Sequence, residues 1–516
     1  MEKTKEKKLH EHQPHDDRFS QQKSEDSVKH TESSYKIKKR ANKTKEAVYT
    51  FLIKKIVFSS PNIRNQLLKQ FEKKLHTDLV EKNKNFPKQV QEKKYEYIMA
   101  MLNSGLRNLD KGNISKKIAE RILNTLVKYS FIQKELCKET RDKFKEKFGI
   151  LPPTFIVLSP TQKCNLHCVG CYASARVDAP RLSYEIVNEI CDEVYNEWGN
   201  RFMTISGGEP FMYRDGGKTL FDIWKKYNEM FFLVYTNGTL INKENAKKLA
   251  ELGNVTPAIS IEGFEKETDE RRGKGIFKKV LEAADNLKEA GVPFGFSITV
   301  TKKNINLLLD DKFYDFIFQE IGASYLWMFQ LMPIGQAKDA KELMITPEQR
   351  VKLYRKWEYL LKEKKYCIAD FWNSGVLSNG CIAYGRNGGY LYIDWNGNIM
   401  PCVFVPYYEN NIKELYSQNK KLADALFSEL FVKGRNWQCK YGLDNSKKPK
   451  NWLMPCSIRD HWVNFRDEVL TKNSKPEDEY AKQALESEEY NKTLEEFDKE
   501  LSEKTEPIWK KEYLEE

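Results

Sequence analysis

With 516 residues, the chain is too long for one compact core, and ordinary domain sizes predict about three structural units. Hydrophobic residues make up 40% and charged residues 31%, and no run of about 18 apolar residues predicts a membrane-spanning helix. The net charge of +12 favours anionic partners such as acidic redox proteins, but it is so evenly interleaved with acidic residues that a solvated surface explains it more simply.

Residues 1–44 are polar and nearly free of large apolar side chains, which predicts a disordered tail. The stretch from Met1 to Lys8 lacks the apolar core of a secretory signal, so we expect a cytoplasmic protein. In residues 45–150 apolar positions recur four residues apart with little strand character. This pattern predicts an all-helical N-terminal unit.

The stretch from Val48 to Phe58 places Lys54 and Lys55 among large apolar side chains. Such a stretch can lie on an anionic membrane, which would give a peripheral membrane contact and suit a lipid substrate. The alternative, favoured by the ordinary amphipathic rule, is a core helix of the N-terminal unit. No basic patch with interleaved aromatic residues predicts a nucleic-acid partner.

From Phe155 onward, short apolar runs alternate with longer amphipathic stretches, which is typical of strand–helix units on a parallel sheet. We therefore expect an α/β fold in which residues 151–345 form a partial (β/α)6 barrel with right-handed crossovers. Barrels of this kind carry their chemistry on the loops that follow the strands. The predicted strands are residues 155–159, 202–206, 231–235, 256–261, 294–300 and 325–331.

Three further segments are predicted after the barrel. Residues 346–370 read as a helical linker, residues 371–470 as a domain of another kind, and residues 471–516 as a charged helical tail. Within the second of these, two short apolar runs flank Trp395-Asn396-Gly397, and Asn-Gly is a strong hairpin signal. The C-terminal domain is therefore expected to contain a hairpin.

The ten cysteines indicate metal binding more than a disulfide framework, because reducing compartments keep thiols free. Seven of them fall into two groups. The other three fit buried small apolar side chains. The first group is Cys164, Cys168 and Cys171, the second is Cys381, Cys402, Cys439 and Cys456, and the scattered residues are Cys137, Cys191 and Cys367.

The first group lies on the loop directly after the first predicted strand. Three thiolates at the spacing of Cys164, Cys168 and Cys171 can each bind one iron of a cubane and leave the fourth iron for a chelating cofactor. Zinc is the alternative, with His167 as the local fourth ligand, although three residues between the first two cysteines suit zinc-finger spacings poorly.

This spacing, on the loop after the first strand of a six-strand partial barrel, resembles the radical S-adenosylmethionine (SAM) superfamily. Gly207-Gly208-Glu209-Pro210, after the second strand, resembles the family motif whose backbone and Glu contact the amino group of SAM. The resemblance also implies contacts from later strand ends to the ribose, carboxylate and adenine of SAM. A plain turn is the alternative for the Thr236 stretch, and ordinary surface charge is the alternative for the arginines. The residues in those positions are Thr236 to Thr239, Ser260, Glu262, Arg271, Arg272, Thr299 and Thr301.

The resemblance implies a [4Fe-4S] cluster, bound SAM, and reductive cleavage of SAM to a 5'-deoxyadenosyl radical that takes hydrogen from a substrate. It also implies a low-potential electron donor of the ferredoxin or flavodoxin type. A peptide, a lipid or a small metabolite is the expected substrate, and the missing strand signal in residues 45–150 weakens the peptide interpretation. The alternative is a non-catalytic iron-sulfur electron carrier or redox sensor, which has no need of the motif at Gly207.

Cys381 and Cys402 bracket the predicted hairpin, which resembles the SPASM or twitch extension of the superfamily, whose hairpin-flanking cysteines ligate an auxiliary cluster. Cys439 and Cys456 would complete four ligands for one auxiliary [4Fe-4S] cluster. A full SPASM domain has a dense later run of cysteines for two clusters, so we expect one here. Four thiolates favour electron transfer over substrate binding, and tetrahedral zinc is the alternative occupant.

Overall fold

The computed structural model describes residues 48–125 and 137–516, so the predicted tail, residues 1–44, lies outside the described residues. The chain divides into two units, Met1–Phe51 and Leu52–Glu516. Every element named below belongs to the second unit. In the part of the chain that is described, no helix is both long and apolar enough to span a membrane.

The core is a ten-stranded sheet in the order β11-β9-β8-β1-β2-β3-β4-β5-β6-β7. Its strands from β1 to β7 pair in parallel with their chain neighbours. The expected α/β class with six consecutive parallel strands is therefore confirmed. The strands are β1 (Phe155–Leu158), β2 (Phe202–Ile205), β3 (Phe231–Thr236), β4 (Val255–Ser260), β5 (Gly295–Val300), β6 (Leu326–Gln330), β7 (Ile368–Asp370), β8 (Tyr390–Ile393), β9 (Asn398–Met400) and β11 (Asn410–Asn411).

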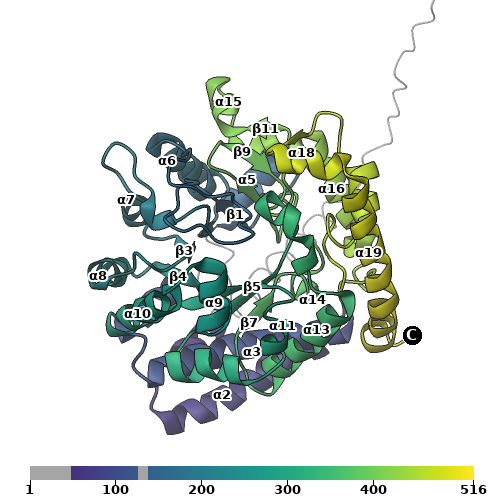
Figure 1. Ribbon diagram of the computed structural model, residues 1–516. Coiled ribbons are helices and arrows are strands. Elements are labelled where there is room, and N and C mark those ends of the chain that lie inside the picture. The colour runs from purple at the N-terminus through teal and green to yellow at the C-terminus, as the bar shows by residue number, and fades with distance from the viewer. Residues whose placement is uncertain (1–47, 126–136) are drawn as a thin grey trace, which may run out of the picture. The chain divides into compact units, whose positions relative to one another are not determined.

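Amphipathic helices connect the parallel strands and cover the outside of the sheet (Figure 1). They form because their apolar residues recur at helical spacing; α6, for example, buries Val187, Ile190 and Cys191 after a Ser183 N-cap. The loops that carry the site follow the ends of these strands. The helices are α6 (Tyr184–Asp192), α7 (Leu220–Lys226), α8 (Lys243–Leu252), α9 (Glu265–Arg272), α10 (Ile276–Glu289), α11 (Ile305–Leu308) and α12 (Lys312–Asp315).

The N-terminal helices pack directly on this core. Asn108 of α3 donates to the carbonyl of Ala323 at 3.1 Å, and Ser104 accepts from the backbone of Cys367 at 3.2 Å. In the stretch around Lys54, Ile56 is fully buried whereas Phe58 is 46% exposed, so membrane contact stays a prediction. The helices are α2 (Pro61–His76), α3 (Lys88–Asp110), α4 (Lys116–Ile122) and α5 (Lys138–Phe148).

Residues 346–370, expected as a helical linker, are helical only in their first part. Helix α13 (Pro347–Lys362) is followed by β7, which adds a seventh parallel strand beside β6. The buried run of three residues in β7 is too short to give a periodic signal, and only its pairing with β6 makes it a strand. The helix of the expected linker therefore ends at Lys362, and the last residues of the segment form a strand.

The predicted hairpin is present as β8 and β9, which pair antiparallel around Gly397. However, β8 also pairs in parallel with β1, from Phe155 opposite Tyr390 to Leu158 opposite Ile393. The segment expected as a separate domain thus extends the main sheet. Its helices, with those of the C-terminal segment, are α14 (Gly375–Ser378), α15 (Ile412–Ser417), α16 (Glu429–Gln438), α17 (Trp462–Asn464), α18 (Glu479–Glu486) and α19 (Glu488–Ile508).

A fully buried ion pair joins α13 to the C-terminal segment. Arg350 donates to both carboxylate oxygens of Asp460, at 2.5 and 3.0 Å, and to the carbonyl of Leu453 at 2.9 Å. Its third nitrogen donates to Asn373 at 3.2 Å, and Asp460 also accepts from the backbone of Cys456 at 3.1 Å. This one guanidinium therefore links three segments that are distant in the sequence.

We expect Asp460→Ala to lower the free energy of unfolding by about 3–5 kcal/mol, because it leaves the buried Arg350 cation without a partner. Urea denaturation of the apoprotein measures the change. The control is Glu244→Ala, which removes the exposed partner of Lys248 on α8 and should leave the midpoint unchanged. Equal destabilisation by both substitutions would contradict this account of the buried pair.

Candidate cofactor and active site

The first cysteine group lies on the loop that follows β1. Cys164 is buried, and Cys168 and Cys171 are half-buried. Burial, together with the nearby Glu209, Cys168 and Cys171, raises the pKa of the Cys164 thiol to about 11, although a hydrogen bond from the Leu166 backbone opposes the rise. The structure thus brings the three thiols together, and a metal that binds them must displace their protons.

Gly207 and Gly208 hold the loop after β2 against the cysteine loop. A Cβ on Gly207, where φ is +117°, would lie 2.5 Å from the carbonyl oxygen of Thr161, and one on Gly208 would lie 2.3 Å from that of Lys163. The backbone of Gly208 donates to Thr161, and that of Glu209 donates to Lys163, both at 2.8 Å. In this structure the two glycines therefore permit a close approach to the protein's own backbone.

Glu209 is fully buried and joins the loops after β2 and β3. Its carboxylate accepts from Thr236 Oγ1 and the Asn237 backbone at 2.8 Å, and from the Phe211 backbone at 3.1 Å. Burial raises its pKa to about 7, although these hydrogen bonds oppose the rise. Since a carboxylate offers about four acceptor positions, the protein uses three and one is left for a ligand such as an ammonium.

The Thr236-Asn237-Gly238-Thr239 turn reaches the cysteine loop directly. Asn237 Nδ2 lies 3.7 Å from the Cys164 sulfur and donates to Asn165 Oδ1 at 2.9 Å. Asn165 in turn donates to Thr239 Oγ1 at 2.9 Å. These contacts give the turn a positioning role, which goes beyond that of a plain turn.

Glu262, at the end of β4, is also buried and is surrounded by donors. It accepts from Arg272 Nε at 2.9 Å and Nη2 at 2.5 Å, from the backbone of Thr299 at 3.0 Å, and from Arg271. Arg272, expected from the resemblance to hold the carboxylate of SAM, here forms its ion pair with Glu262. Ser260, at the end of the same strand, lies 3.3 Å from Ser297 Oγ.

The two arginines connect this cluster to the cysteine loop. Arg271 Nε donates to the carbonyl of Val169 at 3.1 Å, and the backbone of Val169 donates to that of Arg271 at 2.9 Å. Arg272 Nη1 lies 3.9 Å from the sulfur of Cys168. The loop after β4 is therefore tied to the same cysteine loop as those after β2 and β3.

Sequence reasoning gave no role to two residues that position this loop, Asn165 and Tyr172. The hydroxyl of Tyr172 lies 2.8 Å from Ser206 Oγ, and Asn165 bridges to the turn after β3. Asn165 and Tyr172 each follow a cysteine directly, which is the one signal that singles them out. Their partners lie on other strands, so no local pattern identifies them.

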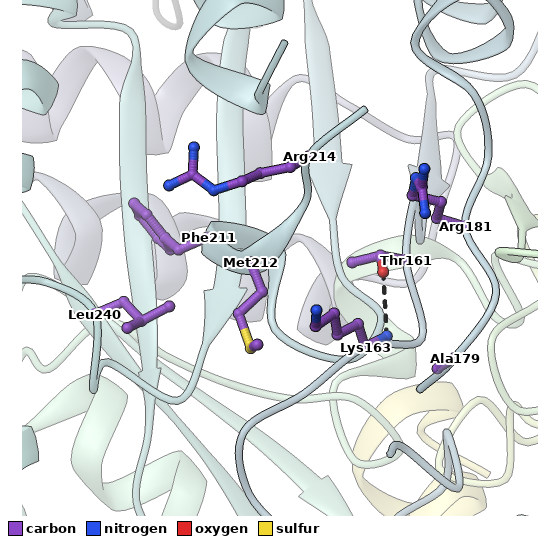
Figure 2. Close-up of a pocket in the computed structure, with 8 residues that line it drawn as sticks. All are labelled: Thr161, Lys163, Ala179, Arg181, Phe211, Met212, Arg214 and Leu240. Atoms are coloured by element: carbon purple, nitrogen blue, oxygen red, sulfur yellow. Dashed lines mark hydrogen bonds between the residues drawn. The ribbon is translucent and has the colours of Figure 1, made fainter. Parts of the chain in front are cut away.

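A pocket of about 240 Å³ lies beside the cysteine loop, and its lining residues are drawn in Figure 2. They come from the stretch leading into Cys164, from the loop before α6, and from the segments after β2 and β3. The lining residues are Thr161, Lys163, Ala179, Arg181, Phe211, Met212, Arg214 and Leu240.

The second cysteine group gathers around the β8–β9 hairpin. Cys402 is buried, and its sulfur lies 2.9 Å from the hydroxyl of Tyr390 on β8. Burial raises the pKa of Cys456 well above its ordinary value, and the nearby Asp460, Cys381 and Cys402 raise it further. Three of the four predicted ligands are thus neighbours.

Cys439 directly follows α16, beside the same group. The preceding Gln438 donates from Nε2 to the carbonyl of Cys381 at 3.0 Å. Within residues 48–125 and 137–516, no three His, Cys, Asp or Glu side chains converge on a single metal ion. A cubane instead takes each thiolate on a separate iron.

The environment of the buried cation Arg459 indicates whether an anionic cluster fits the second cysteine group. Arg459 is fully buried between the rings of Trp372 and Phe497, each 5.0 Å away, and none of its guanidinium nitrogens has a hydrogen-bond partner among the described residues. The nearby Asp498 supplies no charge at neutral pH, because burial raises its pKa to about 9. A buried guanidinium needs an acceptor, so an iron-sulfur cluster held by thiolates at Cys456 fits this environment.

We expect Gly208→Ala to destabilise the apoprotein by about 1–3 kcal/mol and to reduce iron uptake on anaerobic reconstitution, because its Cβ cannot fit against Lys163. Urea denaturation and iron analysis measure the two effects. Gly105→Ala on α3, with nothing within 4 Å of its Cβ, is the matched control and should keep both wild-type values. Full iron uptake by the Gly208 variant would rule out this packing constraint.

The chain resembles known proteins in sequence and fold. Residues 158–309, which include both glycines and the first cysteine group, match the family described as "Radical SAM superfamily". The chain is 30% identical to the mycofactocin maturase MftC of Mycobacterium ulcerans over 297 residues, which cover 55% of this chain and 75% of that protein. It is 27% identical to an AdoMet-dependent heme synthase of Methanosarcina barkeri over 293 residues, covering 51% and 80%. The crystal structure of SuiB from Streptococcus suis bound to S-adenosylmethionine superposes with a TM-score of 0.46 at 18% identity, covering 58% and 71%. The chain belongs to the radical SAM superfamily.

Proposed function

We propose that the protein is a radical SAM enzyme that holds a [4Fe-4S] cluster on Cys164, Cys168 and Cys171 and binds SAM beside it. The observation that carries the proposal is the binding of one cysteine loop to the ends of three successive strands, through Glu209, Asn237 and the Glu262 cluster. When bound, the cluster and SAM would supply one-electron cleavage of the SAM sulfonium and a 5'-deoxyadenosyl radical that takes hydrogen from a substrate.

The residues of the chain have separate parts in this proposal. Gly207, Gly208 and Pro210 shape the backbone beside the cluster, and the free acceptor position of Glu209 suits an ammonium. Ser260 and Thr299, at the ends of β4 and β5, offer hydroxyls toward ribose and adenine. A reducing compartment such as the cytoplasm would keep the ligand thiols free for iron.

The same proposal includes one auxiliary [4Fe-4S] cluster of SPASM or twitch type on Cys381, Cys402, Cys439 and Cys456. The partnerless guanidinium of Arg459 supports it, since four thiolates around iron place negative charge next to that cation. An auxiliary cluster with four protein ligands would pass electrons, because no iron is left for a substrate.

The substrate is a peptide, a lipid or a small metabolite in this proposal. Deuterated candidates of each class can be incubated with the reduced enzyme and SAM. Deuterium in the released 5'-deoxyadenosine identifies the molecule whose hydrogen is taken.

We expect the Cys164/Cys168/Cys171→Ala variant to lose about four iron atoms per chain and to release no 5'-deoxyadenosine from SAM and dithionite. The matched control is Cys137→Ala, because Cys137 belongs to neither cysteine group. This variant should keep the wild-type iron content and the formation of 5'-deoxyadenosine. Iron binding without 5'-deoxyadenosine in the wild type would instead support an iron-sulfur electron carrier or redox sensor.

We expect Cys402→Ala to lose about four iron atoms and one of two reduced-cluster signals in electron paramagnetic resonance, because it removes a ligand of the second group only. Formation of 5'-deoxyadenosine from SAM without substrate should persist. An iron content in the Cys402 variant equal to that of the wild type would reject the auxiliary cluster. Zinc bound to the wild type in place of a second set of four iron atoms would reject it as well.

A further inference from the structure

The pocket beside the cysteine loop is lined by cations and apolar side chains and by no acidic residue. Figure 2 shows the side chain of Lys163 beside Met212 and that of Arg214 above Phe211, with Leu240 on the other side of Met212 from Lys163. The third cation, Arg181, lies across the pocket. A ligand that fits this lining carries negative charge and some apolar surface.

Two of the three cations are uncompensated. Arg181 donates to Asp215 at 2.9 and 3.1 Å, and this carboxylate also accepts from the backbone of Tyr184. Lys163 and the exposed Arg214 have no ion-pair partner among the residues described. In the chain segment before the lining residue Ala179, Arg176 and Asp178 are both exposed, and their charges offset each other. The pocket therefore keeps a net positive charge, which attracts an anionic partner.

One lining residue of the pocket, Phe211, packs against the helix that covers the strands. Phe211 packs against Trp224 of α7 at 5.8 Å, and Trp224 packs against Phe232 of β3. Because side chains alternate along a strand, Tyr235 of β3 points to the opposite face, where its ring lies 5.5 Å from Phe329 of β6. Phe211 of the pocket lining and the Tyr235–Phe329 pair therefore lie on opposite sides of β3.

The pocket is nevertheless next to a predicted cluster ligand. Lys163, which lines it, is covalently bonded to Cys164, and Thr161 contributes to the same wall. A bound partner would therefore be one residue away from the cluster. This position next to the cluster suits the exchange of electrons.

We propose that this pocket is the docking site of an acidic one-electron donor protein, whose acidic side chains pair with Lys163 and Arg214. The inference rests on the proposed function, which requires an electron for each cleavage of SAM. In the docked complex the donor is oxidised by one electron, the cluster is reduced by one, and no bond forms or breaks in that step.

The test compares two reductants in the reconstituted holoenzyme, with 5'-deoxyadenosine as the product. Reduced flavodoxin must dock, whereas dithionite is small and need not. We expect Arg214→Glu to raise the KM for flavodoxin by about tenfold or more, with weaker dependence on salt, and to leave the dithionite-driven rate unchanged. Lys278→Glu, an exposed charge reversal on α10, is the matched control and should keep the wild-type KM.

Direct binding gives a readout that does not depend on turnover. The Kd of flavodoxin, measured by calorimetry, should rise by about tenfold for Arg214→Glu and for Lys163→Glu, and stay unchanged for Lys278→Glu. An unchanged Kd, or an equal fall of the flavodoxin-driven and dithionite-driven rates, would overturn the docking site. A wild type that forms no 5'-deoxyadenosine with either reductant would overturn the proposed function itself.

Discussion

The backbone of Gly208 lies so close to the carbonyl oxygens of Gln162 and Lys163 that no side chain fits between them. This contact aligns the loop after β2 with the chain that enters Cys164, and it follows from the register of the two strands, in which Leu158 of β1 is opposite Ile205 of β2. Since parallel strands end at the same edge of a sheet, the loops after β1 and β2 begin side by side. The later strands add their loops to this pair.

Two buried carboxylates stabilise that arrangement in different ways. Glu209 accepts only from neutral donors, so burial raises its pKa, whereas Glu262 is paired with two arginines. Burial of a carboxylate is costly unless donors replace the lost water, and here the donors come from loops after different strands. The same hydrogen bonds that compensate the burial therefore fix the positions of the loops around Cys164 and Cys168.

The parallel pairing of β8 with β1 places the second cysteine group on the same sheet as the first. Cys402 contacts Tyr390 at the start of β8, and Cys164 follows the end of β1. The fixed ion pair between Arg350 and Asp460 then positions the turn that carries Cys456. Both thiol groups are thus held by backbone pairing and buried charge, which leaves little freedom between the hairpin and the parallel strands.

The sequence by itself determined the α/β class, the three-cysteine loop, the motif at Gly207 and the hairpin at Gly397, because each depends on residues that are near one another in the chain. Periodicity and turn chemistry are local, so they can be recognised before the chain is folded. These local patterns were enough to indicate the superfamily and to identify a second group of cysteines.

Only the tertiary structure decided that β7 and β8 extend the sheet, that Arg272 pairs with Glu262, and that cations gather beside Lys163. Some of these features join residues that are far apart in the chain, such as Phe155 and Tyr390, and even the nearest pair, Glu262 and Arg272, is 10 positions apart and crosses from a strand end to a helix. A partner at that distance leaves no periodic signal in either segment, since hydrogen bonds and charge pairs depend on which side chains meet after packing. The roles of Glu209, Glu262 and Arg459 were decided by burial and by the donors around them, which the order of residues does not specify.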